Sequence, residues 1–280
     1  MSSDAIAAAI EVARGLGLQV QEPVPLRSTN NVVVWLSPTP VVAKVSRGRN
    51  ASLRRELQVA LELSALGAPV VSAAQGVPAI VHSRHGLDMS FWQYHAQRAS
   101  AHFEGTRVAS GLRRVHAALG QISPGLRANL PSYLLQLQFA RTLLMDSSRV
   151  PALAECDRRL LLTAFDRLKA DLVELAPVES HVVLHGSPHR YNMLLVGDEP
   201  VFIDFENVCT GPVEWDLALL DPQAEQAYGA SVHERLMWVC RSVQSVMTAA
   251  FCWADVDRGD LREHAEWHLA HVRTAVAPYV

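Results

Sequence analysis

Hydrophobic positions in the first part of the chain alternate between helical spacing and the short β-branched runs that are typical of strands. A helical pattern opens the chain, and a second one fills residues 52–67, where Leu53, Leu57 and Ala60 recur at helical spacing before Gly67. Runs rich in valine and aromatic residues predict five strands, at residues 18–27, 31–37, 40–46, 78–84 and 89–95. We therefore expect a five-stranded sheet with one main helix against it.

From residue 96 onward the hydrophobic spacing is mostly helical. Strand-type patterns interrupt it at residues 181–187 and 192–207, and the second reads as a hairpin that turns at Gly197 and Asp198. The expected fold is α+β and bilobal, with a small N-terminal lobe over residues 1–93 and a larger, mostly helical C-terminal lobe over residues 94–280.

Composition narrows the functional classes. The chain of 280 residues is 49% hydrophobic and 19% charged with a net charge of −3, which excludes a disordered tail and gives no sign of a polyanion-binding surface. Charged residues or prolines interrupt every apolar run before it reaches the length of about 18 residues that a membrane span needs. We therefore expect neither a nucleic-acid nor a membrane partner. Asp4 and Glu11 break the pattern of a secretion signal, so we also expect a cytoplasmic protein.

Lysine is rare in this chain, and one lysine stands in an unusual place. Only Lys44 and Lys169 occur among the 25 basic residues, and Lys44 lies inside the apolar run VVAKVS. A charge in such a strand is normally avoided, although a compact ammonium on a thin stem suits a phosphate oxygen.

Three further segments follow Lys44 in an order that suits phosphoryl transfer, a reaction that depends on positioning charge. Glu56 comes twelve residues later on the predicted helix, where it can pair with Lys44. The segment HGSPHRYN contains Asn192 and the segment IDFE contains Asp204, and both side chains offer the oxygen ligands that Mg²⁺ prefers. A hairpin between the last two segments can bring these ligands to one edge.

Taken together, the segments LRSTNN, VVAKV, RREL, VLHGSPHRYNMLL, VFIDFEN and PVEWDLALL resemble the aminoglycoside phosphotransferase and choline kinase group of protein-kinase-like small-molecule kinases. The resemblance covers nearly the whole chain and implies an ATP- and Mg²⁺-dependent (or GTP-dependent) phosphotransferase that acts on a hydroxyl of a small molecule. It implies that Lys44 and Glu56 orient the phosphates, that Asn192 and Asp204 hold Mg²⁺, and that Asp216 braces the catalytic loop. Nucleotide contacts are implied for the hinge at Phe91–Tyr94, with Gln93 and Tyr94, and for the turn that holds Ser28 and Asn30.

The catalytic loop departs from the family pattern at one position. Relatives have His-Gly-Asp there, and the Asp accepts the proton of the acceptor hydroxyl, whereas this chain has Ser187 while Asn192 keeps its register. A serine hydroxyl cannot act as a carboxylate base near neutral pH, and base assistance is worth about 10²–10⁴ in rate. His189 and Glu206 are candidate substitutes for the missing base.

Two other functional hypotheses remain open. The first is a nucleotide-binding pseudokinase with a binding or regulatory role, which the loss of the catalytic Asp favours. The second is a metallohydrolase, because His181, His185 and His189 recur every four residues. Acidic residues late in the chain suggest that the acceptor is an amino-cationic molecule, and they are Asp221, Glu225, Asp255, Asp257, Asp260, Glu263 and Glu266.

Overall fold

The computed structural model describes residues 2–28, 31–46, 51–97, 103–229, 231–257 and 261–276. They form two compact units that are each built from separate stretches of the chain. Unit one comprises Met1–Asn129, Ser187–Val208 and Asp221–Tyr228, and unit two comprises Leu130–Gly186, Cys209–Leu220 and Gly229–Val280. The lobe boundary at residue 93, which was placed where the strand pattern gives way to helical spacing, stays a prediction.

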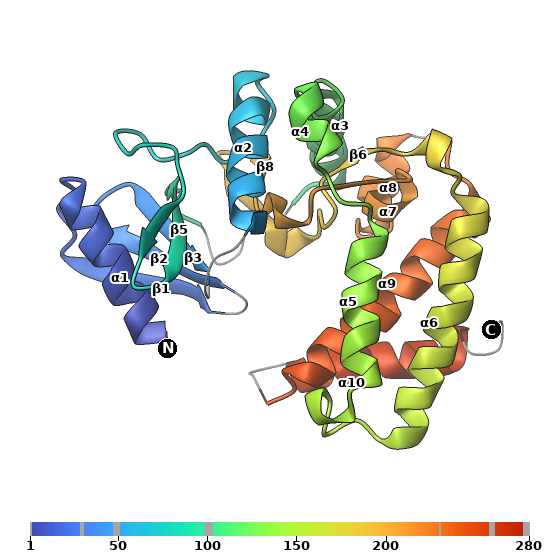
Figure 1. The fold of residues 1–280 in the computed structure, drawn as a ribbon. Helices are drawn as coiled ribbons and strands as arrows, with labels where there is room; N and C mark the ends of the chain where they lie inside the picture. The colour runs from blue at the N-terminus through green and yellow to red at the C-terminus, as the bar shows by residue number, and fades with distance from the viewer. Residues whose placement is uncertain are drawn as a thin grey trace. The chain divides into compact units, whose positions relative to one another are not determined.

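Unit one contains the predicted five-stranded sheet, which is antiparallel throughout and has the strand order β1-β2-β3-β5-β4 (Figure 1). Its strands are β1 (Glu22–Ser28), β2 (Asn31–Ser37), β3 (Val41–Ser46), β4 (His82–Arg84) and β5 (Leu87–Gln93). Side chains alternate between the two faces of a strand. On β3, Val41, Ala43 and Val45 therefore share a buried core with helix α1 (Ser2–Gly15), whereas Val42 and Lys44 face the opposite side.

The α+β fold class and the five-stranded sheet are confirmed, but two strand boundaries were wrong. The expected strand at residues 78–84 is reduced to His82–Arg84, because Pro78 has no backbone N–H and its carbonyl instead accepts the N–H of Ile80 in a local turn. The first strand begins at Glu22 rather than at residue 18, since the chain from Leu16 to Leu18 still bonds to the end of α1.

The rest of unit one consists of helices and one hairpin. These elements are α2 (Ala51–Ala65), α3 (Gly105–Leu119), α4 (Pro124–Ala128), α8 (Pro222–Tyr228), β7 (Met193–Val196) and β8 (Glu199–Phe202). The hairpin β7–β8 turns at Gly197 and Asp198 as predicted, and Gly197 takes the positive φ of 63° that such a turn favours.

Unit two is mostly helical. Helix α9 (Glu234–Ala254) packs against α5 (Leu134–Met145), α6 (Glu155–Leu175) and α10 (Leu261–His271) around one hydrophobic core (Figure 1). The remaining elements are α7 (Glu214–Leu217) and a two-stranded ladder of β6 (Val182–Leu184) and β9 (Cys209–Gly211). Across the described ranges, no helix combines the length and the apolar character that crossing a membrane requires.

Candidate functional site

Lys44 forms a buried ion pair with Glu56. The lysine stands on the central strand β3 and is 6% exposed, and the glutamate stands on α2 and is 2% exposed. The Lys44 Nζ donates to both carboxylate oxygens of Glu56, at 2.9 and 2.8 Å. The pair satisfies two charges that would be costly to bury alone.

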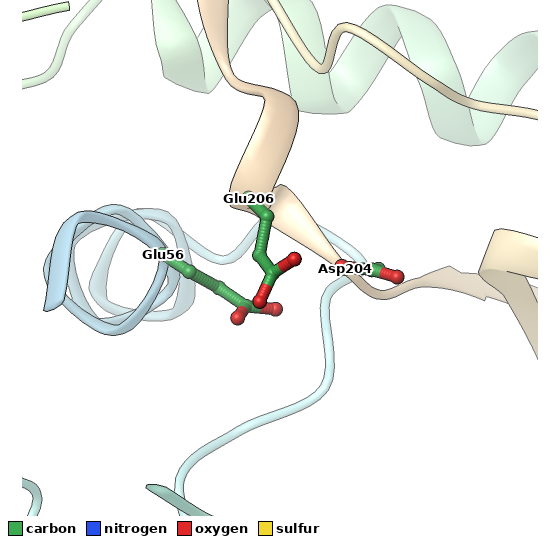
Figure 2. Close-up of side chains that lie close together, drawn as sticks. All are labelled: Glu56, Asp204 and Glu206. Carbon is green, nitrogen blue, oxygen red and sulfur yellow. The ribbon is translucent and has the colours of Figure 1, made fainter. Parts of the chain in front are cut away.

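Two more carboxylates reach the same ammonium from the segment after β8. Lys44 Nζ lies 2.7 Å from Asp204 Oδ1 and 3.2 Å from Glu206 Oε1. Asp204 adopts a left-handed backbone conformation (φ 68°, ψ 58°), which aspartate tolerates better than most residues, and a short 3₁₀ turn (Phe205–Asn207) follows it. Figure 2 shows the carboxyl groups of Glu56 and Glu206 next to each other, with Asp204 on the adjoining segment. We call Lys44, Glu56, Asp204 and Glu206 the Lys44 group.

The Lys44 group holds more negative than positive charge, because three carboxylates share one ammonium. Burial alone would lower the pKa of Lys44, but the neighbouring carboxylates outweigh it and raise that pKa. Burial raises the pKa of Glu56 to about 8 against the opposing effect of Lys44. The charges of the Lys44 group therefore favour the binding of a further cation.

Lys44, Glu56 and Asp204 form part of the wall of a cavity of about 450 Å³ within unit one. Gln93 and Tyr94, the predicted hinge residues, line the same cavity. Most of the remaining wall is apolar and comprises Leu26, Val33, Val42, Ala60, Val71, Trp92, Leu194, Phe202, Ile203 and Phe205. An apolar cavity with a few charged groups at one place suits a flat ring that carries an anionic tail.

Backbone hydrogen bonds and a ring contact fix the hinge. The N–H of Tyr94 donates to the carbonyl of Pro40 at 2.8 Å, and its ring stacks on Trp35 with the ring centres 4.2 Å apart. The N–H of Gln93 donates to the carbonyl of Ser72 at 3.0 Å. These contacts hold the backbone of the hinge at the cavity wall.

The predicted phosphate turn lies partly outside the described residues. Ser28 is the last residue of β1, is exposed and pairs with Val32 in the ladder, whereas Asn30 lies outside the described residues. Arg27, which the sequence analysis did not select, lines the cavity and places its Nη1 4.0 Å from Asp204 Oδ2. A register shift between Pro25 and Arg27 interrupts the regular ladder just before it.

Two side-chain amides contact Ser187 in unit one. Its Oγ accepts N–H bonds from the amide of Asn192 at 3.2 Å and from the amide of Asn207 at 3.3 Å. Asn192 also donates to the carbonyl of Ser187 at 3.0 Å. We call Ser187, Asn192 and Asn207 the Ser187 group.

The two candidate substitute bases, His189 and Glu206, have different neighbours. The backbone N–H of His189 donates to the carbonyl of Ser187 at 2.9 Å, and its ring contacts Tyr191 edge-on. Glu206 instead faces Lys44 and accepts from the amide of Asn31 at 2.8 Å.

A different carboxylate fixes the backbone of the loop in unit two. Asp216 is fully buried on α7, and its two oxygens accept the N–H groups of His185 and Gly186, each at 2.8 Å. The backbone of Gly186 has φ 87°, which only glycine adopts without strain. Asp216 thus braces the residues that lead into Ser187.

The donor chemistry of unit one fits a hard divalent cation. The Oδ1 atom of Asn192 is buried without a hydrogen-bond partner, because its amide nitrogen is the atom that faces Ser187. The carbonyl of Asn192 accepts the N–H of Ile203, the residue before Asp204, at 3.0 Å. This bond joins the segment of Asn192 to the segment of Asp204. A buried amide oxygen and a carboxylate are the ligands that Mg²⁺ prefers.

The structure bears on the metallohydrolase hypothesis and on the placement of the late acidic residues. Among the described residues, the side chains close enough to share a metal ion are Glu56, Asp204 and Glu206. This group contains no histidine, so the three histidines do not form the metal site that the metallohydrolase hypothesis required. The late acidic residues do not form one cluster: Asp221 and Glu225 belong to unit one and the others to unit two, and Asp260 lies outside the described residues.

Four residues of the site were missed in the sequence. Asn31, Arg27 and Arg55 contact the acidic segment, Arg55 by donating to the carbonyl of Glu206 at 3.1 Å, and Asn207 contacts Ser187. Asn207 closes the motif IDFEN, so its place in that motif was the available signal. Arg27, Asn31 and Arg55 lie in the segments LRSTNN and RREL, but the sequence did not predict their contacts with the acidic segment, which join parts of the chain that are far apart.

Comparison with protein families gives one match, which spans residues 21–236 and is described as the phosphotransferase enzyme family. No curated protein sequence matches the chain.

Solved structures of kinases share the fold. The amicoumacin kinase hAmiN in complex with AMP-PNP, Ca²⁺ and Ami has a TM-score of 0.72 and 14% identity over 100% of this chain and 98% of that one. The spectinomycin phosphotransferase APH(9)-Ia with ADP and spectinomycin has a TM-score of 0.69 and 14% identity, covering 95% and 92%. A choline/ethanolamine kinase family protein from Mesorhizobium loti has a TM-score of 0.64 and 17% identity, covering 98% and 94%.

Proposed function

The chain belongs to the phosphotransferase enzyme family, and we propose that it transfers the terminal phosphoryl group of ATP or GTP to an oxygen atom of a small molecule. One observation carries this proposal. A buried lysine contacts Glu56 and Asp204 on the wall of a largely apolar cavity of about 450 Å³.

The chain's own residues take separate parts in the proposed reaction. Lys44 binds the phosphates, and Glu56 holds its ammonium in one orientation. The nucleotide base occupies the apolar part of the cavity beside Gln93 and Tyr94. The family resemblance implies that Ser28 and Asn30 contact the phosphates. Phosphoryl transfer of this kind relies on positioning and electrostatic stabilisation more than on covalent chemistry.

Asp204 and Asn192 would hold Mg²⁺ through a carboxylate and the buried amide oxygen. When bound, the ion neutralises charge on the phosphates. Lys44 separates from Asp204 only if another cation compensates that carboxylate, so metal and nucleotide bind together in this proposal.

A second candidate function is a nucleotide-binding pseudokinase, and the Ser187 group favours it. The residue at the position of the expected base is Ser187, which has a hydroxyl in place of a carboxylate. This hydroxyl accepts hydrogen bonds from two side-chain amides. His189 stays the substitute base of this proposal if the acceptor is an alcohol, because Glu206 is bound to Lys44 and Asn31. Transfer to any small molecule excludes the pseudokinase, whereas binding without transfer supports it.

Calorimetric titration with AMP-PNP, in the presence and absence of Mg²⁺, tests the proposal. We expect saturable binding that requires Mg²⁺, and a loss of about 100-fold in Lys44→Met, since a hydrogen bond to a charged group contributes about 1.5–3 kcal/mol. Asp204→Asn should weaken the dependence on Mg²⁺. Lys169→Met, which changes the only other lysine, should bind as the wild type does. Equal affinity in Lys44→Met and wild type would overturn the proposal, and competition with GTP decides between the two nucleotides.

A further inference from the structure

Two phenylalanines form an exposed aromatic pair on unit two. The ring of Phe139 on α5 stacks on the ring of Phe251 on α9, with the ring centres 5.8 Å apart and 28° between the planes. Phe139 is 57% and Phe251 37% exposed, and Leu135, one turn before Phe139 on α5, is 54% exposed. Contiguous exposed apolar surface on a folded protein often marks a binding site. We call Leu135, Phe139 and Phe251 the Phe139 surface.

Helix α5 joins this surface to the loop that leads into Ser187. Gln136 and Phe139 are neighbours on the surface of α5, because residues three apart on a helix lie side by side. The amide of Gln136 donates to the carbonyl of Gly186 at 3.4 Å, and Gly186 directly precedes Ser187 in the chain. The Phe139 surface therefore begins about one helical turn from the loop at which the acceptor is expected.

Helix α9 joins the other ring to the same loop. The amide of Gln244 donates to the carbonyl of Trp215 at 2.6 Å, and the next residue, Asp216, accepts the N–H of Gly186. Gln244 and Phe251 are seven residues apart, so they share one face of α9. Helices α5 and α9 pack against each other within unit two (Figure 1). Both rings are thus carried by helices that contact the loop or its brace.

The charges on these two helices do not suit an amino-cationic acceptor. Helix α5 carries Arg141 as its one charged residue, and α9 carries Glu234, Arg235 and Arg241. Glu234 is the first residue of α9, whereas the aromatic pair lies near its last turns. The next carboxylate along the chain is Asp255, directly after α9. One carboxylate beside an apolar surface is a poor match for a molecule with several ammonium groups.

We propose that the Phe139 surface binds a flat apolar ring of the phosphoryl acceptor, and that the acceptor is a neutral ring-bearing molecule and not an amino sugar or a quaternary ammonium alcohol. This rests on the proposed function, which supplies the nucleotide and the transfer. Aromatic rings favour offset-stacked or edge-on contacts with one another, and the exposed pair offers such contacts to a further ring. The bound ring then holds the acceptor beside the loop that Gln136 and Asp216 contact.

Binding of 2-naphthylethanol, a neutral alcohol with a flat ring, tests the proposal. With the nucleotide site saturated by AMP-PNP and Mg²⁺, this alcohol, choline and kanamycin are each titrated into the wild type by calorimetry. We expect the naphthyl alcohol to bind most tightly. Phe139→Ala and Phe251→Ala should each weaken its binding by about 10-fold, because ring contacts and buried apolar area are lost. Equal or tighter binding of choline or kanamycin would overturn the proposal.

Val173→Ala is the matched control, since it trims an exposed apolar side chain on α6 in the same unit. Val173 lies two residues after Asp171, which pairs with Arg235 at the opposite end of α9 from Phe251. This variant should bind the naphthyl alcohol as the wild type does, and so should Asp255→Asn. Thermal unfolding of every variant separates a lost ring contact from a lost fold. Binding that is the same in all variants, or that Asp255→Asn weakens most, would overturn the proposal.

Phosphoryl transfer gives a second readout. With ATP and Mg²⁺, phosphorylation of the naphthyl alcohol should show a raised KM and an unchanged kcat in Phe139→Ala, because the rings bind the acceptor without touching the reacting atoms. Faster transfer to choline or kanamycin would contradict the inference, whereas ring-dependent binding without transfer would support the site in a pseudokinase. Failure of AMP-PNP to bind would refute the proposed function. Binding of AMP-PNP without binding of the naphthyl alcohol would overturn this inference alone.

Discussion

Carboxylates at two sites of this protein have different kinds of partner: a side-chain cation at one site and backbone N–H groups at the other. In unit one, Glu56, Asp204 and Glu206 share the ammonium of Lys44, and the half-exposed Arg27 guanidinium lies 4.0 Å from Asp204. In unit two, the Asp216 carboxylate accepts two backbone N–H groups, from His185 and Gly186.

The difference separates a site prepared for ligands from a structural brace. Hydrogen bonds from backbone N–H groups stabilise the charged form of a carboxylate, so it does not depend on a neighbouring cation. Three carboxylates around one ammonium leave an excess of negative charge, which burial makes more costly. The excess at the Lys44 group is therefore what a divalent cation can relieve, whereas Asp216 only positions the loop.

The largest expected effect is that of Lys44→Met. Removing the ammonium leaves the carboxylates uncompensated, and breaking a buried pair in this way costs about 3–5 kcal/mol of unfolding free energy. Urea unfolding at pH 8 should show that loss, and at pH 6 the loss should be smaller because Glu56 then takes up a proton. Added Mg²⁺ should restore part of the stability by binding the folded state. A loss no greater than that of Lys169→Met would show that the group carries no excess charge.

Asp216→Ala should have the next largest effect. It leaves two buried N–H groups without their acceptor, at a cost of about 1–3 kcal/mol each. The matched control is Asp171→Ala in the same unit, which removes a surface ion pair with Arg235 and should cost less than about 1 kcal/mol. Urea unfolding measures both variants. We expect the nucleotide affinity of any folded Asp216→Ala protein to stay within about threefold of wild type, and a larger change would make Asp216 part of the binding site.

The smallest effect concerns pH. The pKa of Glu56 is raised from 4.5 to about 8 in the folded protein, so the folded state binds more protons than the unfolded state between these values. The contribution of Glu56 to stability is full below pH 4.5 and is lost as the pH rises to 8. The pKa of Lys44 is raised as well, but that shift acts above pH 10.5.

Glu56→Gln tests this sign, because it should flatten the fall in stability between pH 5 and 8. Glu62→Gln makes the same change on the same helix, where Glu62 accepts from Ser123 at the surface, and should leave the pH dependence as in wild type. Stability that rises with pH over this window in wild type would contradict the account.

The sequence predicted what depends on local pattern. A lysine within the apolar run of β3 and a glutamate on the helical stripe of α2 are unusual where they stand, and these two residues meet in the structure. The hairpin turn at Gly197 also follows from local turn chemistry.

The sequence could not predict contacts that depend on the backbone after β8. The left-handed conformation of Asp204 and the turn at Phe205–Asn207 decide that Glu206 faces Lys44 and that Asn207 faces Ser187. Aspartate adopts this conformation only when the surrounding structure holds it there, so no pattern in the motif IDFEN announces it. The same limit hid the contact of Asn31 with Glu206, which are 175 residues apart.

The most direct test of the central claim is a crystal structure with AMP-PNP and Mn²⁺, in which anomalous scattering locates the metal. The account predicts a metal peak within coordination distance of Asn192 Oδ1 and an Asp204 oxygen, with Lys44 Nζ on a phosphate oxygen. A metal held by Glu56 and Glu206 without Asn192, or a nucleotide outside the cavity that Lys44 lines, would contradict it.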